Sequence, residues 1–283
     1  MWRAWLKKME IIRKKPTPKN KKQGMLMRKT KIIRFGLPIF VVVLFIPYLL
    51  LSRNTEEKGV VTYVAGRVKK KNPKLENWVT AHKNTQVTKG ERVRTYQRSR
   101  AEIKLAGLDV VRLAPETTID IVKLYEESRD TQIKTTQIDV ESGDLWASVS
   151  KKSKKVKFKL DTPVAGAAIT GTKLEVSFNP DSSSEVRVYR GEVKVSNAKE
   201  DIDKLKIQPK LIKPHQIQGP HQIQGPHEVT MERWLYIVRE MQMLKIDKTG
   251  KVRYAGSFSL KDMKKKANWV QWNMQRDKAL GLR

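Results

Sequence analysis

The sequence predicts a mainly β fold, a layered all-β body that is either a sandwich or a short β-solenoid. From Gly59 to Val195 hydrophobic residues alternate with polar ones, which is the period of half-buried strands. Glycines interrupt this alternation at short intervals, as they do where tight turns join strands. An apolar run near the N-terminus and helical spacing near the C-terminus add one transmembrane helix and a pair of amphipathic helices to this body.

The apolar run is the uncharged stretch 35–52, which as a helix is about 27 Å long and matches the hydrocarbon core of a bilayer. Residues 1–34 contain 13 Lys and Arg and one acidic residue, and positive flanks stay cytoplasmic. No small-residue cleavage site follows the run. We therefore expect a cytoplasmic tail at 1–34, a retained signal anchor at 35–52 with Arg34 and Arg53 at its ends, and a periplasmic portion after a linker at 53–58. This protein would sit in the inner membrane as a single-pass protein and contact its lipid.

The net charge of +30 would ordinarily suggest nucleic acid as a partner. The predicted orientation places most of this charge outside the cytoplasm, so we expect no nucleic-acid partner. Lipid head groups and anionic wall or outer-leaflet polymers are the polyanions available there. The sequence has no cysteine, which excludes a lipid anchor on cysteine and any disulfide, so the exported domain must be held by its core alone.

Within the β domain predicted at 59–197, strand-turn-strand units recur, and each is expected to be a hairpin. The clearest is Val186 to Val195 around Gly191. Similar units run from Ile138 to Val149 around Gly143, from Val60 to Val68 around Gly66, and from Ile103 to Leu113 around Gly107.

The order of these elements resembles the FecR family. The segments that carry the resemblance are GVVTYVAGRV, KGERVRT, SRAEIKLAGLDVVRLAPETTIDI, ESGDLWASV, FKLDTPVAGAAITGTKLEV and VRVYRGEVKV, which together span about residues 59–196. The most specific block is Thr162-Pro163 followed by Gly171-Thr172, before the turn at Gly191. We interpret these five residues as makers of turns: Pro163 fixes the chain, Gly171 permits a positive φ, and the Thr172 hydroxyl bonds a neighbouring amide.

The resemblance implies an envelope signalling protein whose exported domain receives a signal, usually behind a cytoplasmic anti-sigma domain. Here the tail of 34 residues is too short for that helical domain and is rich in Lys and Pro. The resemblance therefore supports the exported interaction domain more than binding to a sigma factor.

Residues 198–228 are expected to form a linker that contains the repeat Pro-His-Gln-Ile-Gln-Gly. His215, His221 and His227 recur every six residues, which fits no short metal motif, so we predict a duplicated linker or edge strand and no metal site.

Residues 229–283 are expected to form the helical pair. Met231, Trp234, Leu235, Val238, Met241 and Leu244 would line the first helix, and the second would open at Ser259, capped with Asp262. Leu260, Met263, Ala267, Val270 and Met274 would form the seam of the second helix. The candidate contacts with a partner or a membrane are Trp234, Trp269, Trp272, Lys264, Lys265 and Lys266, although both helices can instead pack on each other or on the β body.

No catalytic motif is present. The glycines at 166 and 171 have P-loop spacing, but the following Thr and Lys are in the wrong order and a strand follows. We therefore predict no enzyme activity and no cofactor. The main hypothesis is a non-enzymatic interaction module that binds a periplasmic or envelope protein, as a scaffold or a signal receiver. The alternatives are an anti-sigma regulator with a minimal tail and a binder of anionic cell-wall or outer-leaflet polymer.

Overall fold

The computed structural model describes residues 58–75, 77–105, 109–128, 132–150, 156–198, 202, 205, 208–212, 233–262 and 266–282. All of them belong to one compact unit that runs from Thr55 to Arg283. The predicted anchor, its flanking Arg34 and Arg53, and the histidine repeat lie outside the described residues. Within the described ranges, no helix has the length and apolar character needed to cross a bilayer.

Strands dominate this unit and form two sheets, as the prediction of a layered β body requires. In pairing order, sheet A contains β4 (Gln86–Val87), β1 (Gly59–Ala65), β6 (Arg100–Lys104), β7 (Val110–Leu113), the second half of β9 (Lys134–Ser148), β12 (Lys173–Phe178), β13 (Ser184–Arg190), β17 (Gln242–Ile246) and β18 (Val252–Ser257). All of these pairings are antiparallel.

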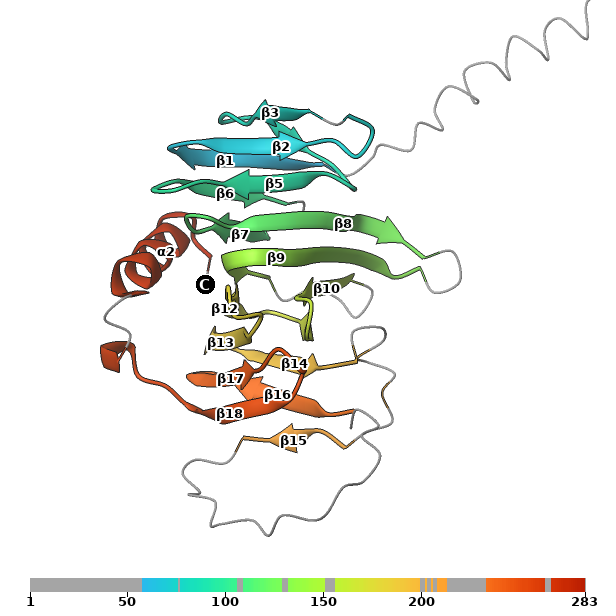
Figure 1. Cartoon of the computed structure of the whole chain (residues 1–283), viewed down its shortest axis with the longest axis vertical. Coiled ribbons are helices and arrows are strands. Elements are labelled where there is room, and N and C mark those ends of the chain that lie inside the picture. The colour runs from blue at the N-terminus through green and yellow to red at the C-terminus, as the bar shows by residue number, and fades with distance from the viewer. Residues whose placement is uncertain are drawn as a thin grey trace, which may run out of the picture. The chain divides into compact units, whose positions relative to one another are not determined.

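Sheet B is the second sheet of the unit. In pairing order it contains β3 (Trp78–Thr80), β2 (Val68–Lys71), β5 (Arg92–Thr95), β8 (Thr118–Glu127), the first half of β9, β10 (Val156–Asp161), β11 (Gly166–Ile169), β14 (Glu192–Ser196), β16 (Leu235–Arg239) and β15 (Lys210–Leu211). The pairs β9–β10 and β15–β16 are parallel, and the other pairs are antiparallel. Figure 1 shows these strands stacked one after another from β3 at the top to β15 at the bottom.

The chain passes repeatedly between the two sheets, and this corrects three of the predicted hairpins. At Gly191 the chain leaves β13 in sheet A and enters β14 in sheet B. Gly66 joins β1 to β2 in the same way, and Gly143 is a bend inside the continuous strand β9, where it crosses from sheet B to sheet A. Only the unit around Gly107 is a true hairpin, because Ala101 of β6 pairs with Leu113 of β7.

These crossing points are corners, and Gly143 shows why a glycine is needed there. Its φ is +84°, and a Cβ atom would lie 2.5 Å from Thr117 Oγ1 and 2.7 Å from Thr117 Cα. Both the backbone conformation and the close approach therefore exclude a side chain. The corner lets alternating residues on both halves of β9 face one core, in which Ile138, Val140 and Leu145 are fully buried.

The first of the two predicted C-terminal helices is wrong. Residues 235–239 and 242–246 are the strands β16 and β17, which extend sheets B and A beyond β14 and β13. The apolar residues have helical spacing, but hydrogen bonding to the open edges of β13 and β14 stabilises these segments as strands instead. Met241, with φ of +57°, makes the corner without a glycine, and Val238 and Leu244 are fully buried in the core.

The second predicted helix exists, but it begins later and its buried face overlaps the predicted seam only at Val270. Ser259 Oγ accepts a hydrogen bond from Lys261 N (3.2 Å) in the short 3₁₀ turn η4 (Leu260–Asp262), and the helix α2 spans Ala267–Ala279. Its buried residues are Trp269, Val270, Asn273 and Asp277. Of the predicted seam, Val270 is buried, whereas Met274 and Leu260 are exposed by 37% and 44%, so the packing face contains only part of the apolar seam.

Candidate functional site

A shallow groove crosses the outer face of sheet B over β10, β11 and β14 and is the candidate site of the molecule. Along these strands the apolar side chains face the core, while the residues between them point outward. Cross-strand register places Lys159 opposite Ala168, and Ala168 opposite Lys194. The small methyl group of Ala168 thus lies between two long lysine side chains, and the surface is hollow there.

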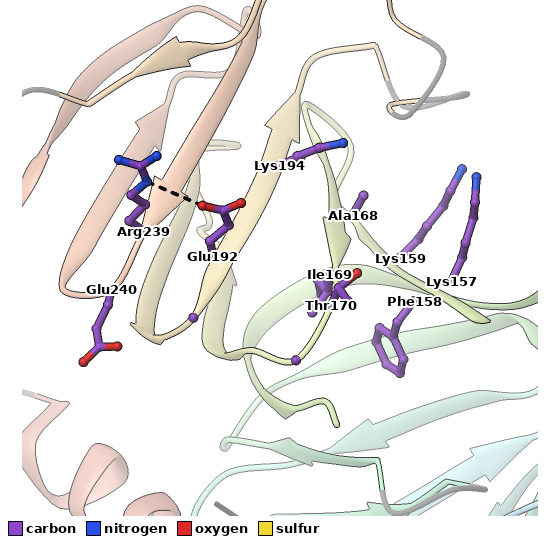
Figure 2. Close-up of a pocket in the computed structure, with 12 residues that line it drawn as sticks. Lys157, Phe158, Lys159, Ala168, Ile169, Thr170, Glu192, Lys194, Arg239 and Glu240 are labelled. Atoms are coloured by element: carbon purple, nitrogen blue, oxygen red, sulfur yellow. Dashed lines mark hydrogen bonds and ion pairs between the residues drawn. The ribbon is translucent and has the colours of Figure 1, made fainter. Parts of the chain in front are cut away.

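The groove has a volume of about 630 Å³ and is bordered mainly by cations. Lys157, Lys159, Lys194 and Arg239 line it, together with the acids Glu192 and Glu240. Figure 2 shows Lys157 and Lys159 of β10 extending side by side, and Lys194 on β14, which lies on the other side of β11. Arg239 Nε lies 3.5 Å from Glu192 Oε2, an exposed ion pair at the rim. An extended acidic segment is the ligand that this charge pattern and shape favour.

The predicted turn motif lies at one end of this groove. Gly171 and Gly191 both line it and have φ of +66° and +87°. A Cβ atom on Gly191 would be 2.7 Å from the carbonyl oxygen of Gly171, so the two corners are in direct contact. Thr172 Oγ1 donates to the carbonyl of Glu192 (2.9 Å), which is a carbonyl rather than the amide that we expected. The geometry of the groove end is therefore set by backbone contacts between two corners.

Thr162 and Pro163 form a second turn, between β10 and β11. The amide of Thr162 donates to the carbonyl of Ala165 (2.8 Å), and Ala165 N donates back to Thr162 Oγ1 (3.2 Å). The hydroxyl of Ser184 reaches Thr162 Oγ1 at 2.8 Å, which ties this turn to β13 of the other sheet. Pro163 is exposed on the turn. This turn fixes the register between Lys159 and Ala168 that shapes the groove.

On the opposite face of the unit, α2 lies against the part of sheet A that β6, β7 and β9 form (Figure 1). We use the name α2 network for Glu102, Arg112, Ser148, Arg276 and Asp277, which connect the helix to the sheet. Arg112 is fully buried and binds Glu102 Oε2 through Nε and Asp277 Oδ1 through Nη1, both at 2.7 Å. Arg276 binds both oxygens of Glu102 (2.7 Å each), and Ser148 Oγ donates to Asp277 Oδ2 (2.8 Å).

The α2 network controls the ionisation of Glu102. Burial raises the pKa of this carboxyl, but hydrogen bonds from Arg276, Arg112 and Thr62 outweigh burial and lower the pKa to about 2. The same pairing raises the pKa of Arg276. Glu102 and Arg276 are therefore both ionised at neutral pH, and their pairing holds the helix by charge as well as by packing.

The tryptophans that we predicted as partner contacts are used inside the unit. Trp269 is 6% exposed and stacks on Trp272, with 5.4 Å between ring centroids, in a cluster with Trp146 and Tyr189. Trp234 is 7% exposed and donates its indole N–H to the carbonyl of Gly250 at 2.8 Å. Trp234 and Trp269 thus have little surface to offer to a partner, and α2 packs on the β body.

Of the three predicted lysines, Lys266 is described, and Lys264 and Lys265 lie outside the described residues. Lys266 Nζ binds Asp144 Oδ1 (2.7 Å), Glu175 Oε1 (3.2 Å) and Ser177 Oγ (3.0 Å). Glu175 is fully buried, so this lysine is the N-terminal tether of α2 to sheet A.

One family of known proteins matches part of this unit. Residues 91–194 match the family model described as FecR protein. This segment is similar to the FecR family. It includes the groove strands β10, β11 and β14 and the turn motif, and it ends within β14, before the strands β16 to β18 and α2. The resemblance expected over residues 59–196 is confirmed for this part.

Two crystal structures of a protein from Parabacteroides distasonis ATCC 8503, described as a putative anti-sigma factor, are similar to the chain at 13% identity and a TM-score of 0.38. The similarity covers 59% of this chain and 59% of that one, so the chain spans less than two thirds of this relative. No curated protein matches the chain.

The sequence did not identify the groove residues Lys157, Lys159, Ala168 and Lys194. Their alternation with Phe158, Leu160 and Val193 placed them on the outer face of strands. Their convergence depends on β14 pairing with β11 rather than with β13, which no local pattern indicates.

Proposed function

We propose that this protein is a non-enzymatic, single-pass inner-membrane protein whose periplasmic FecR domain is an interaction module in envelope signalling or scaffolding. The single observation that carries the proposal is the FecR match at residues 91–194. The basic head and the uncharged run 35–52 that precede it support the membrane topology. The groove over β10, β11 and β14 is the surface that we assign to an acidic segment of the partner protein.

The topology is tested with single cysteines, because the natural chain has none. Lys278→Cys lies on the exposed side of α2, and Asn20→Cys lies in the predicted tail. A membrane-impermeant maleimide should label Lys278→Cys in intact spheroplasts and label Asn20→Cys only after lysis. The reverse labelling pattern would refute the proposed orientation.

The partner surface is tested by photocrosslinking in cells. A photoreactive residue at Thr170, which is exposed and lines the groove, should capture one discrete partner, whereas the same residue at Lys83, exposed and outside the groove, should not. Reversing the charges in Lys159→Glu/Lys194→Glu should abolish the adduct, and Lys83→Glu should leave it unchanged. Equal capture at both positions, or an adduct that survives the double reversal, would contradict the assignment of the groove.

The regulator alternative makes a separate claim about the tail. A peptide of residues 1–34 should bind a sigma factor if the protein regulates transcription directly, and should not if signalling passes through an envelope partner. Because the tail peptide contains no part of the FecR domain, this assay is independent of the groove.

A further inference from the structure

A second pocket, which we call the arginine pocket, lies at the corners between β1 and β2, β5 and β6, and β7 and β8. Its volume is about 630 Å³, within the range of small-ligand sites. The charged residues that line it are Arg67, Arg94, Arg98 and Glu116, which leaves two positive charges in excess. Hydroxyl groups of Ser99, Thr118 and Ser142 complete the lining.

Among the residues that the structure describes, none of the three arginines forms an ion pair, although Glu116 lines the same pocket. This contrasts with Arg92 on the same strand as Arg94, which pairs with Asp120. Three cations that share one concavity repel each other, so an anion that enters is favoured by all three.

Two of the arginines are held in fixed positions. The guanidinium carbon of Arg67 lies 3.8 Å from the centre of the Tyr96 ring, over its face. Arg94 lies over the ring of Trp78 at 4.8 Å and donates from Nε to Thr118 Oγ1 (3.1 Å). Stacked guanidinium groups lose little freedom when they bind, and their forked N–H groups match the oxygens of a phosphate or carboxylate.

The other two charged residues have strained backbone conformations. Arg98 has φ of +52° and Glu116 has φ of +58°, in the left-handed region that glycine or asparagine would occupy at lower cost. Strain of this kind is found where the position of a side chain serves a function.

We propose that the arginine pocket binds a phosphate monoester. Its second ionisation gives a dianion above about pH 6, and this charge equals the excess in the pocket. The ligand oxygens would accept hydrogen bonds from Arg67, Arg94 and Arg98, and the hydroxyls of Thr118 and Ser142 would donate to the remaining oxygens. Ser99 Oγ is already used, because it donates to the carbonyl of Gln97 (3.0 Å) and accepts from Arg67 N (2.8 Å). The inference goes beyond the proposed function, because it concerns a different surface and a small ligand.

The test is a calorimetric titration of the full-length protein in detergent with glycerol 1-phosphate at pH 7.5. The monoester should bind more tightly than glycerophosphoglycerol, a diester with one negative charge on the same backbone. The diester represents the phosphate of a lipid head group or a wall polymer, so the comparison separates these sources from a free monoester. Equal affinities for the two, or no binding of either, would overturn the proposal.

Two variants of opposite sign locate the site. Arg98→Gln should weaken binding about tenfold, because it removes a charge-assisted contact. Glu116→Gln should tighten binding about threefold, because it removes the only acid of the lining, and a misfolded protein cannot produce this gain. Arg190→Gln and Glu127→Gln, both exposed and outside the pocket, are the matched controls for net charge. If the controls change affinity as much as the pocket variants, the pocket is not the binding site.

Discussion

The α2 network predicts that stability depends on pH through one carboxyl, Glu102. The usual pKa of a glutamate in the unfolded chain is 4.5, and the folded value is about 2. A group whose pKa is lowered by folding stabilises the native state above its unfolded pKa, and this stabilisation is lost as the pH falls towards the folded pKa. The difference corresponds to about 3 kcal/mol of unfolding free energy at neutral pH, at about 1.4 kcal/mol per pKa unit. Most of this, about 2 kcal/mol, should be lost between pH 7 and pH 3.

Glu102→Gln isolates this contribution. The variant cannot ionise at position 102, so its unfolding free energy should fall by about 2 kcal/mol less than that of the natural protein over the same pH range. Other carboxyls whose pKa is lowered, such as Asp247 and Glu126, are present in both proteins and cancel in the comparison. The measurement is urea denaturation at pH 7 and pH 3, with tryptophan fluorescence as the signal of unfolding.

Two further variants test whether the difference in pH dependence comes from Glu102. Thr62→Val removes one hydrogen bond, from Thr62 Oγ1 to Glu102 Oε1 at 2.7 Å, and should raise the pKa of Glu102 and reduce the pH dependence partly. Glu192→Gln changes an exposed rim glutamate and should leave the pH dependence as it is. If Glu102→Gln and the natural protein lose equal stability between pH 7 and pH 3, the reasoning about the α2 network is refuted.

Three other predictions concern the corners, the helix and the core. Gly191→Ala and Gly143→Ala should each lower the unfolding free energy by about 2–4 kcal/mol, because both combine a positive φ with a backbone clash, whereas Gly281→Ala, with φ of +67° and open space, should cost about 1 kcal/mol. Thermal denaturation that ranks the three equally would contradict this. Asp277→Ala leaves buried Arg112 without one of its two acids and should cost about 3–5 kcal/mol and increase hydrogen exchange in α2, while the exposed Lys278→Ala should do neither. Trp234→Phe removes the hydrogen bond to Gly250 and should cost about 1 kcal/mol by urea denaturation, and an unchanged midpoint would show that this bond contributes nothing.

The layered β body was predictable because its signal is local. Alternation in Val186-Arg187-Val188 and in Val193-Lys194-Val195 reports which side chains face the core, and these valines are buried. The partner of each strand is a different question. The chain around Gly107 and the chain around Gly191 have the same alternation, yet the first is a hairpin and the second a corner. The difference depends on distant strands, β12 and β17 beside β13, and β11 and β16 beside β14.

The C-terminal part was less predictable for two reasons. The run Leu235-Tyr236-Ile237-Val238 is rich in aromatic and β-branched residues, which favour strands, but its apolar spacing also fits a helix. The absence of glycine between Arg239 and Gln242 concealed the corner at Met241. In α2 the buried face carries Asn273 and Asp277, and a search for an apolar seam cannot find a face that packs through polar contacts.

The distribution of charge over the two sheets explains why binding is assigned to sheet B. On sheet A, outward-facing Glu102, Arg112 and Glu175 are almost completely buried because α2 and Lys266 close over them. An apolar helix face could slide on an apolar sheet, whereas ion pairs at fixed positions hold α2 in one register. That part of the face is therefore occupied by the chain itself. On sheet B the outward-facing residues of β10, β11 and β14 border the groove, and their cations lie at the surface of a hollow rather than under a helix. The same alternation that builds one core thus leaves part of one face closed by α2 and the other face available to ligands of opposite charge.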